Sequence, residues 1–458
     1  MKSNVSSNSS NPSLGEWIYT LFSQRLQAGW LVNIDRHVIL DLAERKLAEF
    51  SQFSPNFISI ATLDPIEFIA NLMAGLRLGI PIFLGNPHWG TVEWAQVSKL
   101  TAEVNRQQHQ HLVMIPTGGS SGKIKFVIHT WETLSASVWG FQEFYEVGEI
   151  NALCTLPLYH VSGLMQLWRS LLTGGKLFII DFHQLYNAPN VFVDRIDLEC
   201  YFISLVPTQL SKLLDLDSKW LNQFQTILVG GAPPRIELLN RARIAQLPLA
   251  LTYGMTETGS QVTSLKPAEF LAGNNSCGRV LPHAEIELVS SGNELKSLRI
   301  KARSLMLGYF PNLDAATFFE PDDLGSFAGG TDPHQRDGYL TILGRTSGKI
   351  ISGGENVFPI EIVDAIMASG LVADVWVMGL PDRYWGQVVT ALYVVNDLPV
   401  SATILSSTLV GKISNYKIPK RWIPVTQIPR NSLGKILNQE VTELVNQFTA
   451  CNERSRWR

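Results

Sequence analysis

The chain has few of the residues that would hold a small secreted or metal-stabilised fold together. Its four cysteines lie far apart in 458 residues and form no Cys-x-x-Cys pair, so neither a disulfide framework nor a zinc knuckle is indicated. Residues 1–13 are rich in Ser and Asn and lack the apolar run of a signal peptide. We therefore expect a disordered segment at 1–13 and a cytoplasmic protein.

Long apolar runs and an excess of one charge are also missing. No stretch approaches the roughly 20 apolar residues that a membrane helix needs, so we expect no membrane insertion. The 37 Lys and Arg residues nearly balance the 40 Asp and Glu residues, which gives a net charge of −3. This balance excludes a broad electrostatic attraction to nucleic acid or anionic lipid. The expected ligands are therefore small molecules.

The composition favours a large globular fold. Apolar residues make up 45% of the chain and charged residues 17%, and cores tend to split beyond about 250–300 residues. Short apolar runs alternate with helical patterns, which predicts an α/β fold with parallel sheets covered by helices. The predicted strands are 57–61, 81–84, 111–115, 152–156, 176–180, 201–206 and 226–229.

The character of the sequence changes after Arg345. We predict a domain boundary there, with an N-terminal domain at 1–345 and a small, basic-leaning C-terminal domain at 346–458. A stretch around 325–337, rich in Gly, Asp and charged residues, predicts an exposed insertion. Proline is tolerated in the first turn of a helix, so Pro233 or Pro234 predicts a helix from there through Leu247.

Segment 117–125 reads TGGSSGKIK and follows an apolar run. Its small residues leave backbone donors and hydroxyls open to phosphate oxygens, and its second lysine adds a cation. The spacing departs from a Walker A loop, because three residues separate the outer glycines and Ile follows the first lysine. The segment is either a phosphate loop or a flexible surface loop. The candidate ligands are Thr117, Ser120, Ser121, Gly122 and Lys125.

Segment 253–259 reads YGMTETG and follows an apolar run. Tyr253 offers an aromatic face for a base, Thr256 a hydroxyl for a phosphate oxygen and Glu257 a carboxylate for a hard cation. The alternative is that Thr and Glu here cap the next helix. Segment 230–233 reads GGAP, and its missing side chains would let a flat ring approach the backbone, although such a sequence also suits a simple turn.

These motifs, in this order, resemble those of the acyl-adenylating superfamily of acyl-CoA ligases, luciferases and peptide-synthetase adenylation domains. The resemblance runs from about residue 55 to 440 and departs at Gly118, Ile124 and Phe126. It implies a large N-terminal domain of helix-covered sheets and a small mobile α+β C-terminal domain. The implied reaction joins a small carboxylic acid to ATP as acyl-AMP, releases pyrophosphate, and then passes the acyl group to coenzyme A. The implied cofactors are ATP, Mg²⁺ and coenzyme A.

The resemblance also implies roles for single residues. Tyr253 would stack on adenine, Thr256 would contact the α-phosphate and Glu257 would hold Mg²⁺. Lys435, in the C-terminal segment PRNSLGKI, would stabilise negative charge as the carboxylate and the α-phosphate react, whereas a solvated lysine is the alternative. The other positions implied on the adenine side are Gly230, Gly231, Ala232 and Gly254.

The ribose side has a less regular match. Asp323 is the nearest equivalent of the family's ribose aspartate, Asp332 is a second candidate, and a solvated loop acid is the alternative. Arg345 matches an arginine near ribose and phosphate. Gly354 belongs to the segment SGGENVFPIE, which in relatives lines the pantetheine tunnel.

Segment 156–172 resembles the subfamily of o-succinylbenzoate–CoA ligases of menaquinone and phylloquinone synthesis. Arg169 would bind the second carboxylate of that acid, because a fatty-acid pocket would leave a buried arginine unpaired at high cost. His160 would gate or line the acyl site as a catalytic and substrate-binding residue, with Ser162 beside it. The alternatives are a packed histidine at the start of a helix over 164–172, and a surface or ion-paired arginine.

Three other functions stay open. One is an aryl- or fatty-acyl–CoA ligase of the same superfamily. A second is a catalytically silent nucleotide-binding homologue, which the irregular phosphate loop would suit. A third is an adenylation domain that loads a separate carrier protein.

Overall fold

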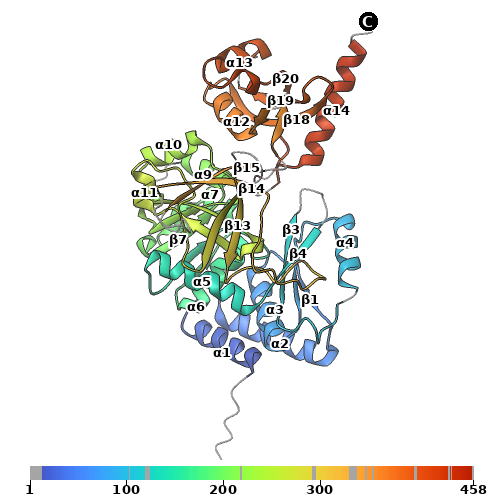
Figure 1. The fold of residues 1–458 in the computed structure, drawn as a ribbon. Helices are drawn as coiled ribbons and strands as arrows, with labels where there is room; N and C mark the ends of the chain where they lie inside the picture. Colours follow the sequence, from blue (N-terminus) through green and yellow to red (C-terminus); the bar gives the residue numbers. More distant parts are fainter. Residues whose placement is uncertain are drawn as a thin grey trace, which may run out of the picture. The chain divides into compact units, whose positions relative to one another are not determined.

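Figure 1 shows the fold as a computed structural model. The structure describes residues 13–102, 104–118, 124–216, 219–290, 296–329, 338–345, 348–352, 355–396, 400–431, 434 and 436–455. The chain divides into two units. The first comprises Met1–Ser204, Met255–Ser260 and Arg303–Ala316, and the second comprises Leu205–Gly254, Gln261–Ala302 and Thr317–Arg458.

A four-stranded sheet of the first unit has the order β1-β2-β3-β4. Its strands are β1 (Ile58–Ile60), β2 (Ile82–Leu84), β3 (Val113–Gly118) and β4 (Ile124–His129). β1, β2 and β3 are parallel, whereas β4 runs antiparallel to β3. Successive side chains point to opposite faces of a strand, so Ile82 and Ile115 join one buried core while Phe83 and Met114 join another.

Helices cover both cores of this sheet. Helix α3 (Pro65–Arg77) packs on β1 and β2, and α4 (Thr91–Thr101) packs on β4. The start of α3 is specified locally, because the Asp64 side chain accepts from the Ile66 N–H at 2.9 Å and Pro65 stands in the first turn. The helices of this unit are α1 (Leu14–Gln27), α2 (Arg36–Phe53), α3 (Pro65–Arg77), α4 (Thr91–Thr101), α5 (Trp131–Tyr145), α6 (Val161–Thr173), α7 (Phe182–Asn187) and α8 (Pro189–Val193).

Parallel strands recur in both units. In the first unit, β5 (Asn151–Cys154) pairs in parallel with β6 (Leu177–Ile179) and with β7 (Tyr201–Leu205). In the second unit, β8 (Thr226–Val229) pairs in parallel with β9 (Leu249–Met255). The order continues to β10 (Ser260–Ser264) and the antiparallel β11 (Arg279–Val280). The residues of β5, β7 and β8 are mostly buried, in agreement with the continuous apolar sequences of these strands.

The second unit also holds an antiparallel sheet with the order β12-β13-β14-β15. Its strands are β12 (Ala284–Ser290), β13 (Lys296–Ala302), β14 (Asp323–Ala328) and β15 (Tyr339–Arg345). The helices in this part of the chain are α9 (Pro207–Leu214), α10 (Ile236–Ile244) and α11 (Pro267–Leu271). The described residues also form short 3₁₀ helices at η1 (Leu198–Cys200), η2 (Lys219–Gln223), η3 (Thr256–Thr258) and η4 (Asn415–Lys417).

The C-terminal part of the chain builds a five-stranded sheet of its own. The order is β17-β16-β19-β18, with β20 pairing in parallel with β19. Val375, Val389 and Leu405 belong to its buried core. Its elements are β16 (Ile350–Ser352), β17 (Glu355–Val357), α12 (Pro359–Met367), β18 (Val372–Asp382), β19 (Gly386–Val395), α13 (Ala402–Leu409), β20 (Arg421–Pro424) and α14 (Asn438–Ser455).

The predicted strands are all present, but two other expectations are wrong. Helix α10 begins at Ile236, because the backbone of Arg235 before it is extended, with ψ 149°. Pro233 is also excluded as a helix start, because it precedes Pro234 and a residue before proline avoids the helical region. The helix ends at Ile244 rather than Leu247. Residues 325–328 belong to strand β14 rather than to an insertion, and 330–337 lie outside the described residues.

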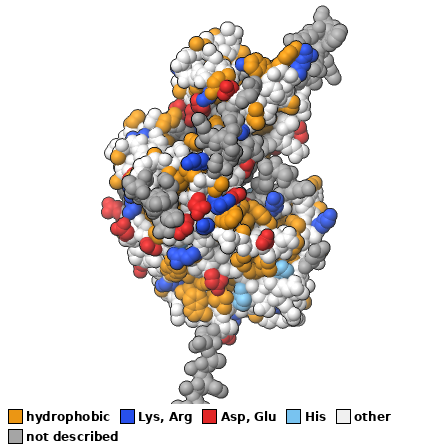
Figure 2. All heavy atoms as spheres, in the orientation of Figure 1, with side chains coloured by type: hydrophobic (Ala, Val, Ile, Leu, Met, Phe, Trp, Pro, Cys, Tyr) orange, Lys and Arg blue, Asp and Glu red, His pale blue; other side chains and the backbone are white. Residues whose placement is uncertain are grey.

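The surface agrees with the balanced composition. On the face drawn in Figure 2, acidic and basic side chains are interspersed among polar and apolar ones. Within the part of the chain that the structure describes, no helix has both the length and the hydropathy needed to cross a membrane.

Phe83 is a fully buried ring whose removal would test the second core of the first unit. Its ring meets those of Phe57, Phe126 and Phe310 edge to face, with centroids 5.4, 5.0 and 5.1 Å away. We expect Phe83→Ala to lower the free energy of unfolding by about 3–5 kcal/mol, because it leaves a cavity. Urea unfolding followed by tryptophan fluorescence measures the loss. Phe53→Ala, at a ring that is 71% exposed, is the control, and equal losses in both variants would contradict this assignment.

Candidate active site

The predicted phosphate loop connects the two strands of a β-hairpin. Thr117 near the end of β3 lies directly opposite Lys125 on β4. Thr117 is half-buried, and Lys125 is exposed. The hairpin therefore brings a hydroxyl and a cation from its two strands together at the base of the loop. Ser120, Ser121 and Gly122 lie outside the described residues.

Lys125 and Glu257 both contact Tyr309. The Lys125 Nζ atom lies 5.0 Å from the centroid of the Tyr309 ring, which is a cation–π contact. The Tyr309 hydroxyl donates to Glu257 Oε1 at 2.7 Å. Burial, followed by the nearby Glu257 carboxylate, raises the pKa of Tyr309, so this hydroxyl keeps the proton that it donates. A single tyrosine thus joins the predicted phosphate cation to the predicted metal ligand.

Thr256 and Glu257 lie in the 3₁₀ helix η3, directly after strand β9. The turn is held by its own backbone and by the segment at 304–306, because Ser304 Oγ donates to the Thr258 carbonyl at 2.7 Å and the Met306 N–H donates to the Glu257 carbonyl at 2.9 Å. Gly259 ends η3 with φ 60°, a conformation that favours glycine. Thr256 and Glu257 are therefore part of a short, anchored turn.

His129, which no motif singled out, fastens η3 to strand β4. Its Nε2 atom lies 2.7 Å from the Thr256 carbonyl oxygen, and its Nδ1 atom lies 3.0 Å from Thr133 Oγ1. A carbonyl can only accept, so Nε2 carries the proton and Nδ1 accepts from Thr133. Burial lowers the pKa of His129 to about 4 against the opposing effect of the Thr256 hydrogen bond. The sequence signal was a histidine inside an apolar run, four residues before a threonine.

A group of three predicted nucleotide residues forms within the second unit. Asp323 Oδ2 accepts from the Tyr253 hydroxyl at 2.7 Å, and Asp323 Oδ1 accepts from Arg345 Nε at 3.2 Å. Asp323 and Arg345 face each other across β14 and β15. Burial, and then the Asp323 carboxylate, raises the pKa of Tyr253. Asp323 is 8% exposed, which excludes the solvated loop acid, and Asp332 lies outside the described residues.

The glycine segment at 230–232 follows β8, next to the strand that carries Tyr253 and Gly254. Because β8 and β9 are parallel and adjacent, their carboxyl ends reach the same edge, where α/β folds bind ligands. Gly231 has φ 82°, and a Cβ on Gly230 would lie 2.5 Å from Thr252 Oγ1. The segment thus needs both glycines for the turn itself, and Ala232 follows them half-buried.

Helix α6 carries the residues predicted to bind the acid. His160 is its N-cap residue and is half-buried, with its ring 4.6 Å from that of Tyr159. Ser162 in the first turn and Arg169 two turns later lie on the same side of the helix, because seven residues make about two turns. The first turn packs so tightly that a Cβ on Gly163 would lie 2.2 Å from the Pro157 carbonyl oxygen.

Arg169 is a buried cation rather than a surface residue, since it is 3% exposed. Its guanidinium lies 4.2 Å from the Phe141 ring centroid, and its Nη2 donates to Ser260 Oγ at 3.2 Å. Burial lowers the pKa of Arg169 to about 10, so the side chain stays charged at neutral pH. Ser260 has φ 103°, and backbone strain of this kind concentrates at functional sites.

The C-terminal candidates are described only in part. Lys435 and Gly354 lie outside the described residues. On either side of Lys435, Arg430 and Ile436 pair in an isolated antiparallel bridge. Arg430 also donates to the Gly434 carbonyl at 3.1 Å and contacts the Asp374 carboxylate at 3.2 Å. Arg430 therefore holds the described part of the predicted lysine loop.

The charged groups fit magnesium bound jointly with a nucleotide. Among the described residues, no three His, Cys, Asp or Glu side chains are grouped to hold a metal. Magnesium is usually bound through one or two carboxylates together with substrate phosphates. Glu257, which accepts the Tyr309 hydrogen bond, could supply a carboxylate of this kind.

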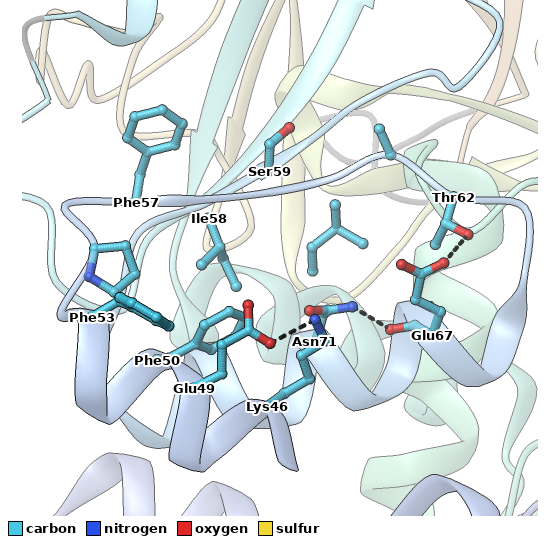
Figure 3. A pocket seen from close by; sticks show the side chains of 13 residues that line it. Lys46, Glu49, Phe50, Phe53, Phe57, Ile58, Ser59, Thr62, Glu67 and Asn71 are labelled. Atoms are coloured by element: carbon cyan, nitrogen blue, oxygen red, sulfur yellow. Dashed lines mark hydrogen bonds and ion pairs between the residues drawn. The ribbon is translucent and has the colours of Figure 1, made fainter. Parts of the chain in front are cut away.

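A pocket of about 440 Å³ lies elsewhere in the first unit, between α2, β1 and α3. Phe50, Phe53 and Phe57 contribute to its lining, and none of the predicted site residues does. Figure 3 shows Lys46 paired with Glu49 at 2.8 Å, and Thr62 and Asn71 both bonded to Glu67. The candidate active site is therefore defined by the contacts among the predicted site residues and not by this pocket.

Comparison with known proteins identifies relatives along most of the chain. The AMP-binding enzyme model matches residues 66–310, and the AMP-binding enzyme C-terminal domain model matches residues 361–435. The 2-succinylbenzoate–CoA ligase of Bacillus licheniformis is 32% identical over 343 residues, which cover 71% of this chain and 68% of that enzyme. The indoleacetate–CoA ligase of Aromatoleum aromaticum is 31% identical over 355 residues, which cover 74% and 68%.

A solved structure shares the fold. O-succinylbenzoate coenzyme A synthetase from Bacillus subtilis, in complex with ATP and magnesium ion, matches with a TM-score of 0.78 at 24% identity, covering 92% of this chain and 99% of that one. The match confirms the predicted α/β fold with a large N-terminal domain and a smaller C-terminal domain.

The buried His129 makes stability depend on pH in a defined direction. Its folded pKa of about 4 lies below the ordinary 6.5, so the unfolded chain takes up the proton first as pH falls. The contribution of His129 is complete above pH 6.5, and we expect roughly 3 kcal/mol to be lost between pH 6.5 and 4. Urea unfolding across this range measures the slope. His129→Gln, checked for native circular dichroism at pH 7.5, should show a smaller slope, and an unchanged slope would refute the assignment.

Proposed function

The chain belongs to the AMP-binding enzyme family, and we propose that it is an ATP-dependent o-succinylbenzoate–CoA ligase of menaquinone or phylloquinone synthesis. The observation that carries the choice of acid is the buried, charged guanidinium of Arg169 on α6. O-succinylbenzoate keeps a second carboxylate after activation, and a desolvated arginine binds a carboxylate strongly. The 32% identity to the Bacillus licheniformis enzyme supports the same acid.

The first step joins a carboxylate oxygen of the acid to the α-phosphorus of ATP and expels pyrophosphate. We assign the pyrophosphate side to Thr117, Lys125 and the loop between them, since the hairpin places a hydroxyl and a cation side by side. Thr256 would contact the α-phosphate. Magnesium, held by Glu257 and the phosphates, would neutralise charge on the leaving group. Lys435 would stabilise the negative charge that gathers on the reacting carboxylate and α-phosphate.

The adenosine half of ATP is assigned to the group in the second unit. Asp323 is an acceptor suited to ribose hydroxyls, and its contacts with Tyr253 and Arg345 fix its orientation. The Tyr253 ring and the turn at 230–232 would receive adenine. In the second step, the thiol of coenzyme A attacks the acyl carbon and AMP leaves. Gly354 would line the path of the pantetheine arm.

The acyl site is assigned to α6 and its surroundings. Ser162 and Arg169 lie on one side of the helix, and His160, its N-cap residue, would gate or line the acyl site. The strained Ser260 and the Phe141 ring both contact the Arg169 side chain. These neighbours hold the guanidinium in one place, which is what recognition of a ring-bound carboxylate requires.

Another aryl-CoA ligase activity is the second candidate, because the indoleacetate–CoA ligase of Aromatoleum aromaticum is nearly as similar in sequence. Indoleacetate has a single carboxylate, which is the group that reacts with ATP. It has no second carboxylate for Arg169 to bind, so the buried charge would have no role in recognising it. A silent nucleotide-binding homologue is a poorer candidate, since Lys125, Glu257 and Asp323 are present with oriented partners.

We also propose a cytoplasmic location. Cys154, Cys200 and Cys277 are free thiols in the structure, which suits a reducing compartment.

An acid-dependent ATP–pyrophosphate exchange assay tests the proposed reaction and its substrate. The panel comprises o-succinylbenzoate, benzoate, indoleacetate and a fatty acid, each followed by addition of coenzyme A. We expect exchange and thioester formation with o-succinylbenzoate at the highest kcat/KM. The absence of exchange with every acid would contradict adenylation, and exchange without thioester would contradict the transfer to coenzyme A.

Replacement of Arg169 tests the assignment of the acid. We expect Arg169→Ala to lower kcat/KM for o-succinylbenzoate by about 10- to 100-fold, the size of a lost charge-assisted contact, with a smaller effect on benzoate. Arg106→Ala is the matched control, because Arg106 Nη2 donates to the Leu78 carbonyl at 2.7 Å within the same unit. An equal loss with both acids would show that Arg169 is only structural.

A further inference from the structure

We infer that Tyr309 is a positioning residue for the ATP–magnesium site, where it orients the Glu257 carboxylate through its hydroxyl and the Lys125 amine through its ring. The inference rests on the proposed function, because it takes Glu257 as the magnesium ligand and Lys125 as a phosphate ligand. Tyr309 itself matched no predicted motif. Its role follows from the contacts of its backbone, its two neighbours in sequence, its hydroxyl and its ring within the first unit.

The backbone of Tyr309 is locked beside strand β4. The Ile128 N–H donates to the Gly308 carbonyl at 3.0 Å, and the Phe310 N–H donates to the Phe126 carbonyl at 2.9 Å. These two hydrogen bonds bracket Tyr309, which forms an isolated antiparallel bridge with Val127. The tyrosine is therefore tied to the same strand that carries Lys125.

The residues on either side of Tyr309 fix the position of segment 308–310 along strand β4. Gly308 has φ 130°, and a Cβ there would lie 2.6 Å from the Asn312 carbonyl oxygen, so only glycine suits this turn. Phe310 is buried and packs edge to face on Phe83 with centroids 5.1 Å apart. One neighbour sets the backbone direction, and the other anchors it in the core.

The hydroxyl of Tyr309 settles the orientation of Glu257. It donates to Oε1 at 2.7 Å, a charge-assisted hydrogen bond that is stronger than a neutral one. The Glu257 backbone is held independently, since the Met306 N–H donates to its carbonyl at 2.9 Å. A carboxylate has two oxygens. The hydrogen bond engages Oε1, and by fixing the carboxylate plane it also fixes the position of Oε2, which would bind the cation.

The ring of Tyr309 makes a cation–π contact with Lys125. The ammonium group lies 5.0 Å from the ring centroid, where the negative face of the ring attracts it. The Tyr309 ring thereby holds the Lys125 ammonium group close to the Tyr309 hydroxyl, which donates to Glu257. Lys125 takes this position through the ring and not through an ion pair with the Glu257 carboxylate. Metal and phosphate ligands that arise from β4 and η3 are thus placed by one side chain.

Binding of ATP without any acid substrate tests this role apart from turnover. Tyr309→Phe removes the hydroxyl and keeps the ring. We expect the Kd for ATP, measured by calorimetry with excess Mg²⁺, to rise roughly 10-fold, whereas the Kd in EDTA stays near the wild-type value. Tyr309→Leu removes the ring as well, so its Kd for ATP in EDTA should also rise, because the cation–π contact that positions Lys125 is lost.

Tyr339→Phe is the matched control, because the Tyr339 hydroxyl donates to Glu269 Oε1 at 2.8 Å outside the predicted site. It should bind ATP like the wild type with and without Mg²⁺. In a double-mutant cycle, Tyr309→Phe should have no further effect on the Mg²⁺-dependent Kd in a Glu257→Gln background. Equal losses with and without Mg²⁺ in Tyr309→Phe, or additive effects in the cycle, would overturn the inference.

The outcomes also separate this inference from the proposed function. A wild-type enzyme that shows acid-dependent pyrophosphate exchange, together with a Tyr309→Phe variant that binds ATP and Mg²⁺ normally, would overturn the role of Tyr309 alone. A wild-type enzyme with no exchange would overturn the proposed function. Should Tyr309→Phe lose native circular dichroism, Tyr309→Trp, which also keeps an aromatic ring for Lys125 and lacks the hydroxyl, carries the same comparison of Kd with and without Mg²⁺.

Discussion

The attachment of η3 to strand β4 is the constraint on which the proposed ATP-binding part of the first unit depends. His129 reaches from β4 to the Thr256 carbonyl, and the chain at 306–310 joins the Glu257 backbone to the same strand. The hairpin that carries Thr117 and Lys125 continues from that strand. A displacement of β4 would therefore move the predicted phosphate and metal ligands together.

The environments of the charged groups are matched to their assigned tasks. Lys125 is exposed and Glu257 is half-buried, as expected of groups that meet a polyphosphate from solvent. Arg169 is buried among Phe141, Ser260 and the α6 helix, where its charge is far less screened by water. His129 is buried and neutral at physiological pH because desolvation lowers its pKa. It serves as a fixed hydrogen-bond donor rather than as a proton carrier.

Sequence periodicity predicted the parallel strands β1–β3 and β5–β8 because each is a short, continuous apolar run between turns. It missed β4 as an antiparallel partner of β3, since Lys125 and His129 break the apolar pattern of 124–129. It also placed the start of α10 too early, because proline marks a first turn only when the backbone around it is helical. Arg235 is extended instead.

The sequence by itself determined the family, the reaction class and most of the residues proposed to bind ATP, because those residues occur in contiguous motifs whose chemistry is local. Only the tertiary structure decided that Arg169 is buried, that Asp323 is held by Tyr253 and Arg345, and that Tyr309 and His129 support Glu257 and Thr256. Such contacts join residues tens to more than a hundred positions apart in the chain. Their partners are set by the packing of strands and turns, which no local pattern records.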